Sequence, residues 1–110
     1  MSDIDWNKYL LELAAKSAGY EVDRQASEYI WQELHQLALL NLQGGHTLWN
    51  PLTDDADALR LAVKLEMYID FMDRRVIAGK DMPEVIYEFG DGDYRWAIVR
   101  AAAEIGRAAQ

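Results

Sequence analysis

The spacing of apolar residues changes after Leu65, and this change constrains the fold more than any other feature of the sequence. Apolar and polar positions alternate over residues 67–72 and again over residues 84–89, as in strands with one buried face. A short apolar run, Arg75-Val-Ile-Ala78, lies between them. Since only short connections join the three segments, the sequence predicts an antiparallel three-stranded meander.

Two helices are predicted on either side of this meander. The first covers residues 55–65, where Leu59 and Val63 widen the apolar stripe, so that burial on more than one side is expected. The second follows Asp93, and its small residues predict a close approach to the sheet. Arg100 and Glu104 are spaced for an ion pair along this helix. Its predicted buried stripe consists of Tyr94, Ala97, Ile98, Ala101, Ala102, Ile105 and Ala109.

The N-terminal part of the chain has a helical pattern. Residues 4–17 predict a helix that buries Trp6, Tyr9, Leu10, Leu13, Ala14 and Ser17. A second helix is predicted to begin at Ser27 and to end at Gly44-Gly45, with a polar connection over residues 20–26. Because Tyr29-Ile30-Trp31 also has strand propensity, residues 28–32 are alternatively the start of a strand.

The predicted fold class is therefore α+β, a three-stranded antiparallel meander packed by helices. Residues 1–110 suit one domain, in which residues 46–110 form a helix–strand–strand–strand–helix core and residues 1–45 form a helical N-terminal extension. The chain has no cysteine, no signal-peptide pattern and no apolar run long enough for a membrane span. These features predict a cytoplasmic protein without a membrane partner.

An acidic turn precedes the helix at 55–65. Pro51 breaks regular structure, and Thr53, Asp54 and Asp55 then offer oxygen acceptors to the free N–H groups of the helix; Asp93 does the same for the last helix. These four residues are predicted to be structural caps. Asp54, Asp55 and Asp57 are alternatively metal ligands, but neither the glycine nor the distant glutamate of a calcium loop is present. We therefore expect no metal and no cofactor.

No catalytic motif is recognisable in the sequence. His35 and His46 lack the spacing of a helical metal pair, and neither a nucleophile elbow nor a phosphate-binding glycine loop occurs. Enzymatic activity is therefore not predicted, and no catalytic residue is proposed. If the chain binds a small ligand or a nucleotide, the residues expected to line the pocket are His46, Trp49 and Arg100.

The tryptophans suggest a different function. Trp31, Trp49 and Trp96 fall outside the main apolar stripes, and tryptophan is common at the centres of protein interfaces. They are candidates for a surface that binds another protein or a second copy of the chain. The simpler alternative is that each tryptophan covers an edge of the hydrophobic core.

The net charge of −8 opposes direct binding to nucleic acid. The element order over residues 55–109 matches that of double-stranded-RNA-binding domains, but acidic residues stand where those domains carry lysines. Acidic mimicry of a nucleic acid, directed at a DNA-binding host protein, is an alternative function. Carboxylates scattered on an ordinary solvated surface are the simpler explanation.

Two segments resemble a known family. Leu48–Leu65, with its Trp-Asn-Pro-Leu element, and Arg95–Gly106 are similar to the phage ABA sandwich domain, a family of small phage and prophage proteins. The resemblance implies a layered α/β arrangement and an origin in an infected or lysogenic bacterial host. It implies no activity and no functional residues. We expect a phage or prophage accessory protein that acts by protein–protein interaction.

Overall fold

Residues 3–78, 85–90 and 92–108 are described by the computed structural model and form four helices and two antiparallel sheets. The helices are α1 (Asp3–Ser17), α2 (Arg24–Leu34), α3 (Asp55–Lys64) and α4 (Tyr94–Ala108). The strands are β1 (Leu37–Leu40), β2 (His46–Trp49), β3 (Tyr68–Asp70), β4 (Arg75–Ala78) and β5 (Val85–Glu88). The α+β class, the N-terminal helix and the three-stranded antiparallel meander are confirmed.

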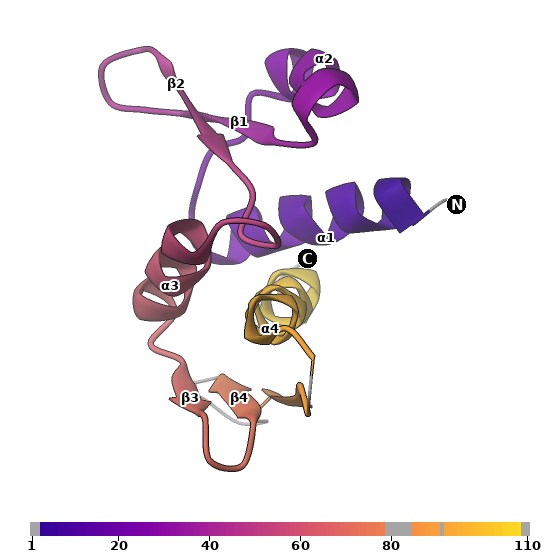
Figure 1. Cartoon of the computed structure of the whole chain (residues 1–110). Helices are drawn as coiled ribbons and strands as arrows, with labels where there is room; N and C mark the ends of the chain where they lie inside the picture. The colour runs from indigo at the N-terminus through magenta and orange to yellow at the C-terminus, as the bar shows by residue number, and fades with distance from the viewer. Residues whose placement is uncertain (1–2, 79–84, 91, 109–110) are drawn as a thin grey trace.

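Helix α4 lies at the centre of the fold. Figure 1 shows α1 on one side of it, the β3–β4–β5 sheet on the other and α3 alongside, while α2 and the β1–β2 hairpin lie beyond α1. The single buried stripe predicted for this helix was therefore too narrow. Because α4 is covered from several sides, its buried positions extend around the helix to Ala97, Ile98, Val99, Ala101, Ala102, Ala103 and Gly106.

The backbones of α1 and α4 approach each other closely at Gly106. A Cβ atom placed on Gly106 would lie 2.1 Å from the carbonyl oxygen of Leu13, so only glycine fits at this position. The small residues of α4 therefore permit a close approach to α1 as well as to the sheet. Helix α1 contributes to the hydrophobic core, since it buries Leu10, Leu11, Leu13, Ala14 and Ala15.

The meander has the predicted alternation. In its register Val76 of β4 lies between Ile69 of β3 and Tyr87 of β5, and Val76 is fully buried against α4. Tyr68 and Ile86 point to the opposite, exposed face. Phe71 falls within the strand predicted over residues 67–72, but it lies in the β3–β4 turn and is exposed, although its ring contacts Phe89 and Tyr94. The short connection predicted between residues 78 and 84 lies mostly outside the described residues.

The prediction of a helix from Ser27 to Gly44-Gly45 was wrong. Helix α2 ends at Leu34, where His35 adopts a left-handed conformation with φ 53°. Residues 37–49 then form the β1–β2 hairpin, which crosses the boundary predicted between residues 45 and 46. An apolar run such as Leu37-Ala-Leu-Leu40 fits a strand as well as a helix, and the two glycines lie in the hairpin loop. The alternative of a strand at 28–32 was also wrong, since these residues are helical.

The start of α2 lies earlier than predicted. Asp23 is the N-cap, and its carboxylate accepts a hydrogen bond from the N–H of Ala26 (3.0 Å). Ser27, where the helix was predicted to begin, is instead a buried residue within α2. Its hydroxyl donates to the carbonyl of Ala38 (3.2 Å) and accepts from the N–H of the same residue (2.8 Å), which fixes α2 against β1.

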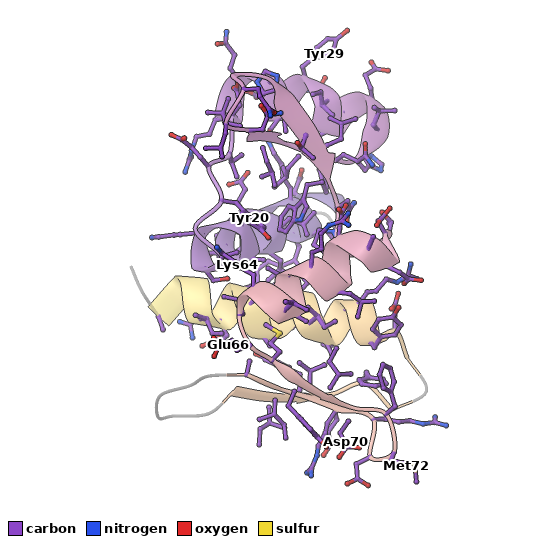
Figure 2. All side chains as sticks on the ribbon, turned by 90° about the vertical axis from the view of Figure 1, so that its left-hand side faces the viewer. Tyr20, Tyr29, Lys64, Glu66, Asp70 and Met72 are labelled. Atoms are coloured by element: carbon purple, nitrogen blue, oxygen red, sulfur yellow. The ribbon has the colours of Figure 1, made fainter. Side chains whose placement is uncertain are left out.

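Helix α3 buries one face and leaves the other in solvent. Ala58, Leu61 and Ala62 are buried, whereas Leu59 is 43% and Val63 is 77% exposed. The expected burial on more than one side was therefore wrong, because α3 lies at the flank of the fold (Figure 2). None of the helices in the described ranges is both long and apolar enough to cross a membrane.

Candidate functional site

The acidic turn before α3 is held by hydrogen bonds within the chain. The Asp54 carboxylate caps α3 by accepting from the N–H of Asp57 (2.9 Å), as predicted. Asp57 in turn accepts from the N–H of Asn50 (3.0 Å). Asp55 accepts from the Tyr94 hydroxyl (2.6 Å), and the Thr53 hydroxyl donates to the Asn50 carbonyl, so neither of these two is the predicted cap.

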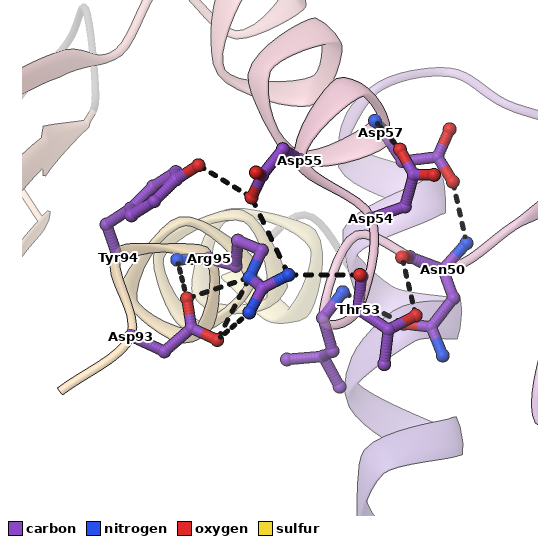
Figure 3. Close-up of polar contacts among 9 residues, drawn as sticks. Asn50, Thr53, Asp54, Asp55, Asp57, Asp93, Tyr94 and Arg95 are labelled. Atoms are coloured by element: carbon purple, nitrogen blue, oxygen red, sulfur yellow. Dashed lines mark hydrogen bonds and ion pairs between the residues drawn. The ribbon is translucent and has the colours of Figure 1, made fainter.

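Arg95 connects the start of α3 to the start of α4 (Figure 3). Its guanidinium donates to both carboxylate oxygens of Asp93 (2.9 and 3.0 Å) and to the carbonyl of Thr53 (3.0 Å), and it lies 3.6 Å from Asp55. Asp93 also accepts from the N–H of Arg95 (2.8 Å), which confirms it as the cap of α4. The hydrogen bond from Arg95 lowers the pKa of the Asp93 carboxyl.

This arrangement accounts for the acidic residues without a metal ion. Arg95 supplies the positive charge between Asp93 and Asp55, and helix N–H groups satisfy Asp54 and Asp93. Within residues 3–78, 85–90 and 92–108, no three His, Cys, Asp or Glu side chains are grouped as metal ligands would be. We interpret the acidic turn as a structural joint between two helices.

Asn50 is a buried polar residue that the sequence did not single out. Its amide donates to the carbonyl of His35 (2.6 Å), which ends α2, and accepts from the N–H of Leu52 (2.8 Å). It therefore joins the α2–hairpin region to the turn before α3. The Asn-Pro pair after a tryptophan was a sign of a turn, but the distant partner of Asn50 could not be identified from the sequence.

The three residues predicted to line a ligand pocket are not brought together. The Nε2 of His46 lies within hydrogen-bond distance (2.7 Å) of a carboxylate oxygen of Asp23, at the side of the hairpin that faces the start of α2. Trp49 is buried with its ring edge-on to Tyr20, at a centroid distance of 5.7 Å. Arg100 lies on α4, and the cavity that it lines is separate from the cavity that includes Trp49.

Two of the three candidate interaction tryptophans are also in the core. Trp31 is 6% and Trp49 is 4% exposed, which leaves neither available to a partner. The three tryptophans therefore do not form one surface, and the simpler alternative of core coverage is correct for these two. Trp96 differs, because 44% of its surface is exposed.

Trp96 belongs to a group of aromatic side chains arranged around Arg100, which we call the aromatic surface; it consists of Trp6, Tyr9, Tyr87, Trp96 and Arg100. The Arg100 guanidinium carbon lies 5.5 Å from the ring centroid of Tyr87, 5.7 Å from that of Trp96 and 5.8 Å from that of Trp6. All three distances are in the range of cation–π attraction. The rings come from α1, β5 and α4, so the group exists only in the folded chain.

The aromatic surface remains partly open to solvent. Trp6 is 43% and Tyr9 is 39% exposed, although both were predicted to be buried in the stripe of the first helix. Their rings lie 5.5 Å apart. Because α1 packs on α4 through Leu10, Leu13 and Ala14, these two aromatics lie at the margin of the contact and remain half in water.

Arg100 lies among the aromatic rings and forms no ion pair with a carboxylate of the described residues. The predicted ion pair with Glu104 is replaced by one between Glu104 and Arg107, and the hydrogen bond from Arg107 lowers the pKa of Glu104. Among the described residues the buried Nε of Arg100 has no hydrogen-bond partner. A cavity of about 100 Å³ between α1 and α4 opens beside it. The guanidinium thus lies between the surrounding rings and this cavity.

A wider hollow adjoins the aromatic surface. It has a volume of about 510 Å³, and Trp96 forms part of its wall together with Asn7, Leu52, Thr53, Glu88, Phe89, Gly92 and Asp93. This volume is in the range of small-molecule sites. The hollow is open to solvent, and its wall includes Thr53 and Asp93, which both accept hydrogen bonds from Arg95.

Comparisons with protein-family models, with curated proteins and with solved structures found no match for this chain. The resemblance to the phage ABA sandwich domain therefore stays a prediction.

Proposed function

We propose that this chain is a non-enzymatic binding protein that holds another protein on its aromatic surface. The observation that carries the proposal is the pair of half-exposed tryptophans, Trp6 and Trp96, whose ring centroids lie 5.8 Å and 5.7 Å from the guanidinium carbon of Arg100. Tryptophan, tyrosine and arginine are the residues that contribute most to protein interfaces.

Pre-organisation supports this function. Arginine normally loses side-chain freedom when it enters an interface, but the rings already restrict Arg100. Covering the exposed part of one tryptophan contributes about 2 kcal/mol, by the usual relation between apolar area and free energy. A partner that offers an apolar side chain to the rings and a carboxylate to Arg100 matches both features.

The biological setting of this proposal rests on the resemblance alone. A phage or prophage accessory protein acting in the cytoplasm of an infected or lysogenic bacterium meets host and phage proteins there. The charge of −8 keeps such a protein away from anionic nucleic acid and lipid.

The test is site-specific crosslinking in lysate of a lysogenic bacterium. A photo-reactive amino acid at Tyr9 is expected to capture a discrete protein, whereas the same probe at Val63, an exposed apolar position on α3, is expected to capture none. Adding Trp96→Ala or Arg100→Ala should abolish capture, and Met72→Ala, at an exposed position in the β3–β4 turn, should leave it unchanged. Equal capture from Tyr9 and Val63 would contradict the proposal.

A small ligand in the hollow beside Trp96 is the second candidate, supported by its volume of about 510 Å³. Nucleotides and other small metabolites can be screened by the NMR signal of the Trp96 indole N–H. A saturable shift that Asp93→Asn changes and Val63→Ala does not would favour it.

Acidic mimicry has less support. Asp23, Asp54, Asp93 and Glu104 all bond to groups of their own chain, so these carboxylates are not free to imitate phosphates. Failure to compete with DNA for DNA-binding host proteins would remove this alternative.

A further inference from the structure

The β1–β2 hairpin lies in an uncharged part of an otherwise strongly charged chain. From Leu34 to Thr53 there is no Asp, Glu, Lys or Arg, and every other run without these residues is far shorter. The hairpin loop projects away from the rest of the chain (Figure 1). Two copies with a charge of −8 each repel one another least where they approach through this segment.

One edge of the hairpin is occupied. Strand β1 pairs with β2 on one side, and on the other the N–H of Asp23 donates to the carbonyl of Ala38 (2.9 Å) while the N–H of Leu40 donates to the carbonyl of Glu21 (2.8 Å). Because backbone groups alternate along a strand, the backbone groups of residues 37 and 39 face β2.

The other edge, formed by β2, is open. In the register Leu37↔Trp49 and Leu39↔Thr47, the backbone groups of Thr47 and Trp49 face β1, so those of His46 and Leu48 point outward. Strand β2 is the outer strand of its sheet in the described part of the chain. Edge strands usually carry charged side chains or proline that prevent pairing, and His46-Thr-Leu-Trp49 has no proline and no Lys, Arg, Asp or Glu.

Exposed leucines lie beside this edge. Leu40 and Leu48 share one face of the hairpin, because the register pairs Leu48 with Ala38 and Leu40 with His46, and they are 40% and 41% exposed. Leu42, in the loop, is fully exposed. A strand added to β2 would therefore also extend an apolar face.

We propose that two copies of this chain dimerise by antiparallel pairing of β2 with β2 about a two-fold axis at Thr47. His46 of each copy then lies opposite Leu48 of the other, and their outward N–H and C=O groups form four backbone hydrogen bonds. This register uses every outward group of β2, whereas a shift by one pair would require the N–H of Asn50, which already donates to Asp57. A two-fold axis makes one edge its own complement.

The dimer does not depend on the aromatic surface, because the hairpin and that surface are formed by different elements. The two proposals can therefore fail separately. A second copy is favoured over a strand of another protein because the edge is self-complementary and uncharged.

The experiment is light scattering on the full chain in size-exclusion chromatography, from about 10 µM to about 1 mM. The mass is expected to rise from that of a monomer towards twice that value. At the axis the two Thr47 side chains face each other, so Thr47→Lys and Thr47→Glu should each weaken the dimer at least about tenfold through like-charge repulsion. Thr47 is exposed, so neither change disturbs the core.

A mixture of the two Thr47 variants gives the most direct test of the β2–β2 pairing. Lys opposite Glu replaces repulsion with attraction, so Thr47→Lys with Thr47→Glu should form a one-to-one heterodimer. Val63→Lys and Val63→Glu are the matched controls at an exposed apolar position on α3 and should dimerise like the unmodified chain. Urea unfolding midpoints check that every variant is folded.

Oxidation gives an independent measurement of the register. The chain has no cysteine, so Thr47→Cys provides its only thiol, and facing positions of this kind are close enough for a disulfide. It should form a covalent dimer much faster than Val63→Cys. A monomeric unmodified chain at all concentrations, dimers unaffected by both Thr47 charges, or equal oxidation of the two cysteine variants would each overturn the proposal.

Discussion

Asn50 and Gly106 show how much of this fold depends on single residues. Asn50 is buried, and its amide bonds to the residue that ends α2 and to the turn that precedes α3. Gly106 lies where the backbones of α1 and α4 approach too closely for any side chain. Each is a small residue whose substitution has an effect that general propensities do not predict.

Replacing Asn50 with alanine is expected to lower the free energy of unfolding by about 2–3 kcal/mol, because it leaves the His35 carbonyl and the Leu52 N–H without their partner. Urea unfolding measures this change. Gln43→Ala, in the exposed hairpin loop, serves as the control and should change stability by less than about 0.5 kcal/mol. Similar values for the two variants would contradict the role assigned to Asn50.

Whether Gly106→Ala stabilises or destabilises the fold tests the close contact between α1 and α4. Alanine in place of glycine within a helix normally stabilises it by about 1 kcal/mol. Here the new Cβ would meet the Leu13 carbonyl oxygen at 2.1 Å, so a loss of about 1–3 kcal/mol is expected as the helices move apart. Thermal unfolding measures the difference, and a stabilised variant would show that α1 and α4 are not in contact at this point.

At the scale of the elements, the starts of α3 and α4 are joined by Arg95. The joint responds to pH because Arg95 lowers the pKa of Asp93 below its ordinary value near 3.8. A carboxyl group with a lowered folded-state pKa stabilises the fold above its unfolded-state value, and this contribution is lost as the pH falls through the folded-state value.

The expected result is a steep decrease of the urea midpoint below about pH 4 in the unmodified chain. Arg95→Gln should lower the midpoint at neutral pH and flatten this decrease, since Asp93 then has no cation to favour its ionised form. Arg60→Gln, which removes an exposed arginine of α3, should keep the steep decrease. If the urea midpoint decreases with falling pH by the same amount in Arg95→Gln and in the unmodified chain, Arg95 does not lower the pKa of Asp93.

The elements differ in how well the sequence predicted them. The helices predicted at 4–17, at 55–65 and after Asp93 have a helical period, and residues 67–72 and 84–89 have the alternation of a strand, so that each pattern favours one structure. The β1–β2 hairpin does not, because a four-residue apolar run has no period of its own. The aromatic side chains around Arg100 could not be predicted either, because Trp6 and Tyr87 come from segments far away in the chain.

The whole molecule is an acidic body with 19 Asp and Glu against 11 Lys and Arg. Such an excess destabilises the compact state by self-repulsion, which salt screens. The exposed ion pairs are screened too, but each contributes less than about 1 kcal/mol. Repulsion over the whole surface is therefore expected to dominate.

Raising NaCl from about 10 mM to about 300 mM should increase the thermal midpoint by a few degrees. The same series should tighten the dimer, because the two copies repel each other less. Differential scanning fluorimetry of dilute protein and light scattering of concentrated protein measure the two effects. A thermal midpoint that falls with salt would mean that local ion pairs outweigh the net charge.

The aromatic surface can also be monitored by the intrinsic fluorescence of its tryptophans. Trp31 and Trp49 are shielded from solvent, whereas Trp6 and Trp96 are half exposed. Iodide in solution therefore quenches the emission of one pair of indoles and leaves the other pair bright. If a protein binds to the aromatic surface, it will cover these indoles and remove the quenchable fraction, so that binding can be followed in unlabelled protein.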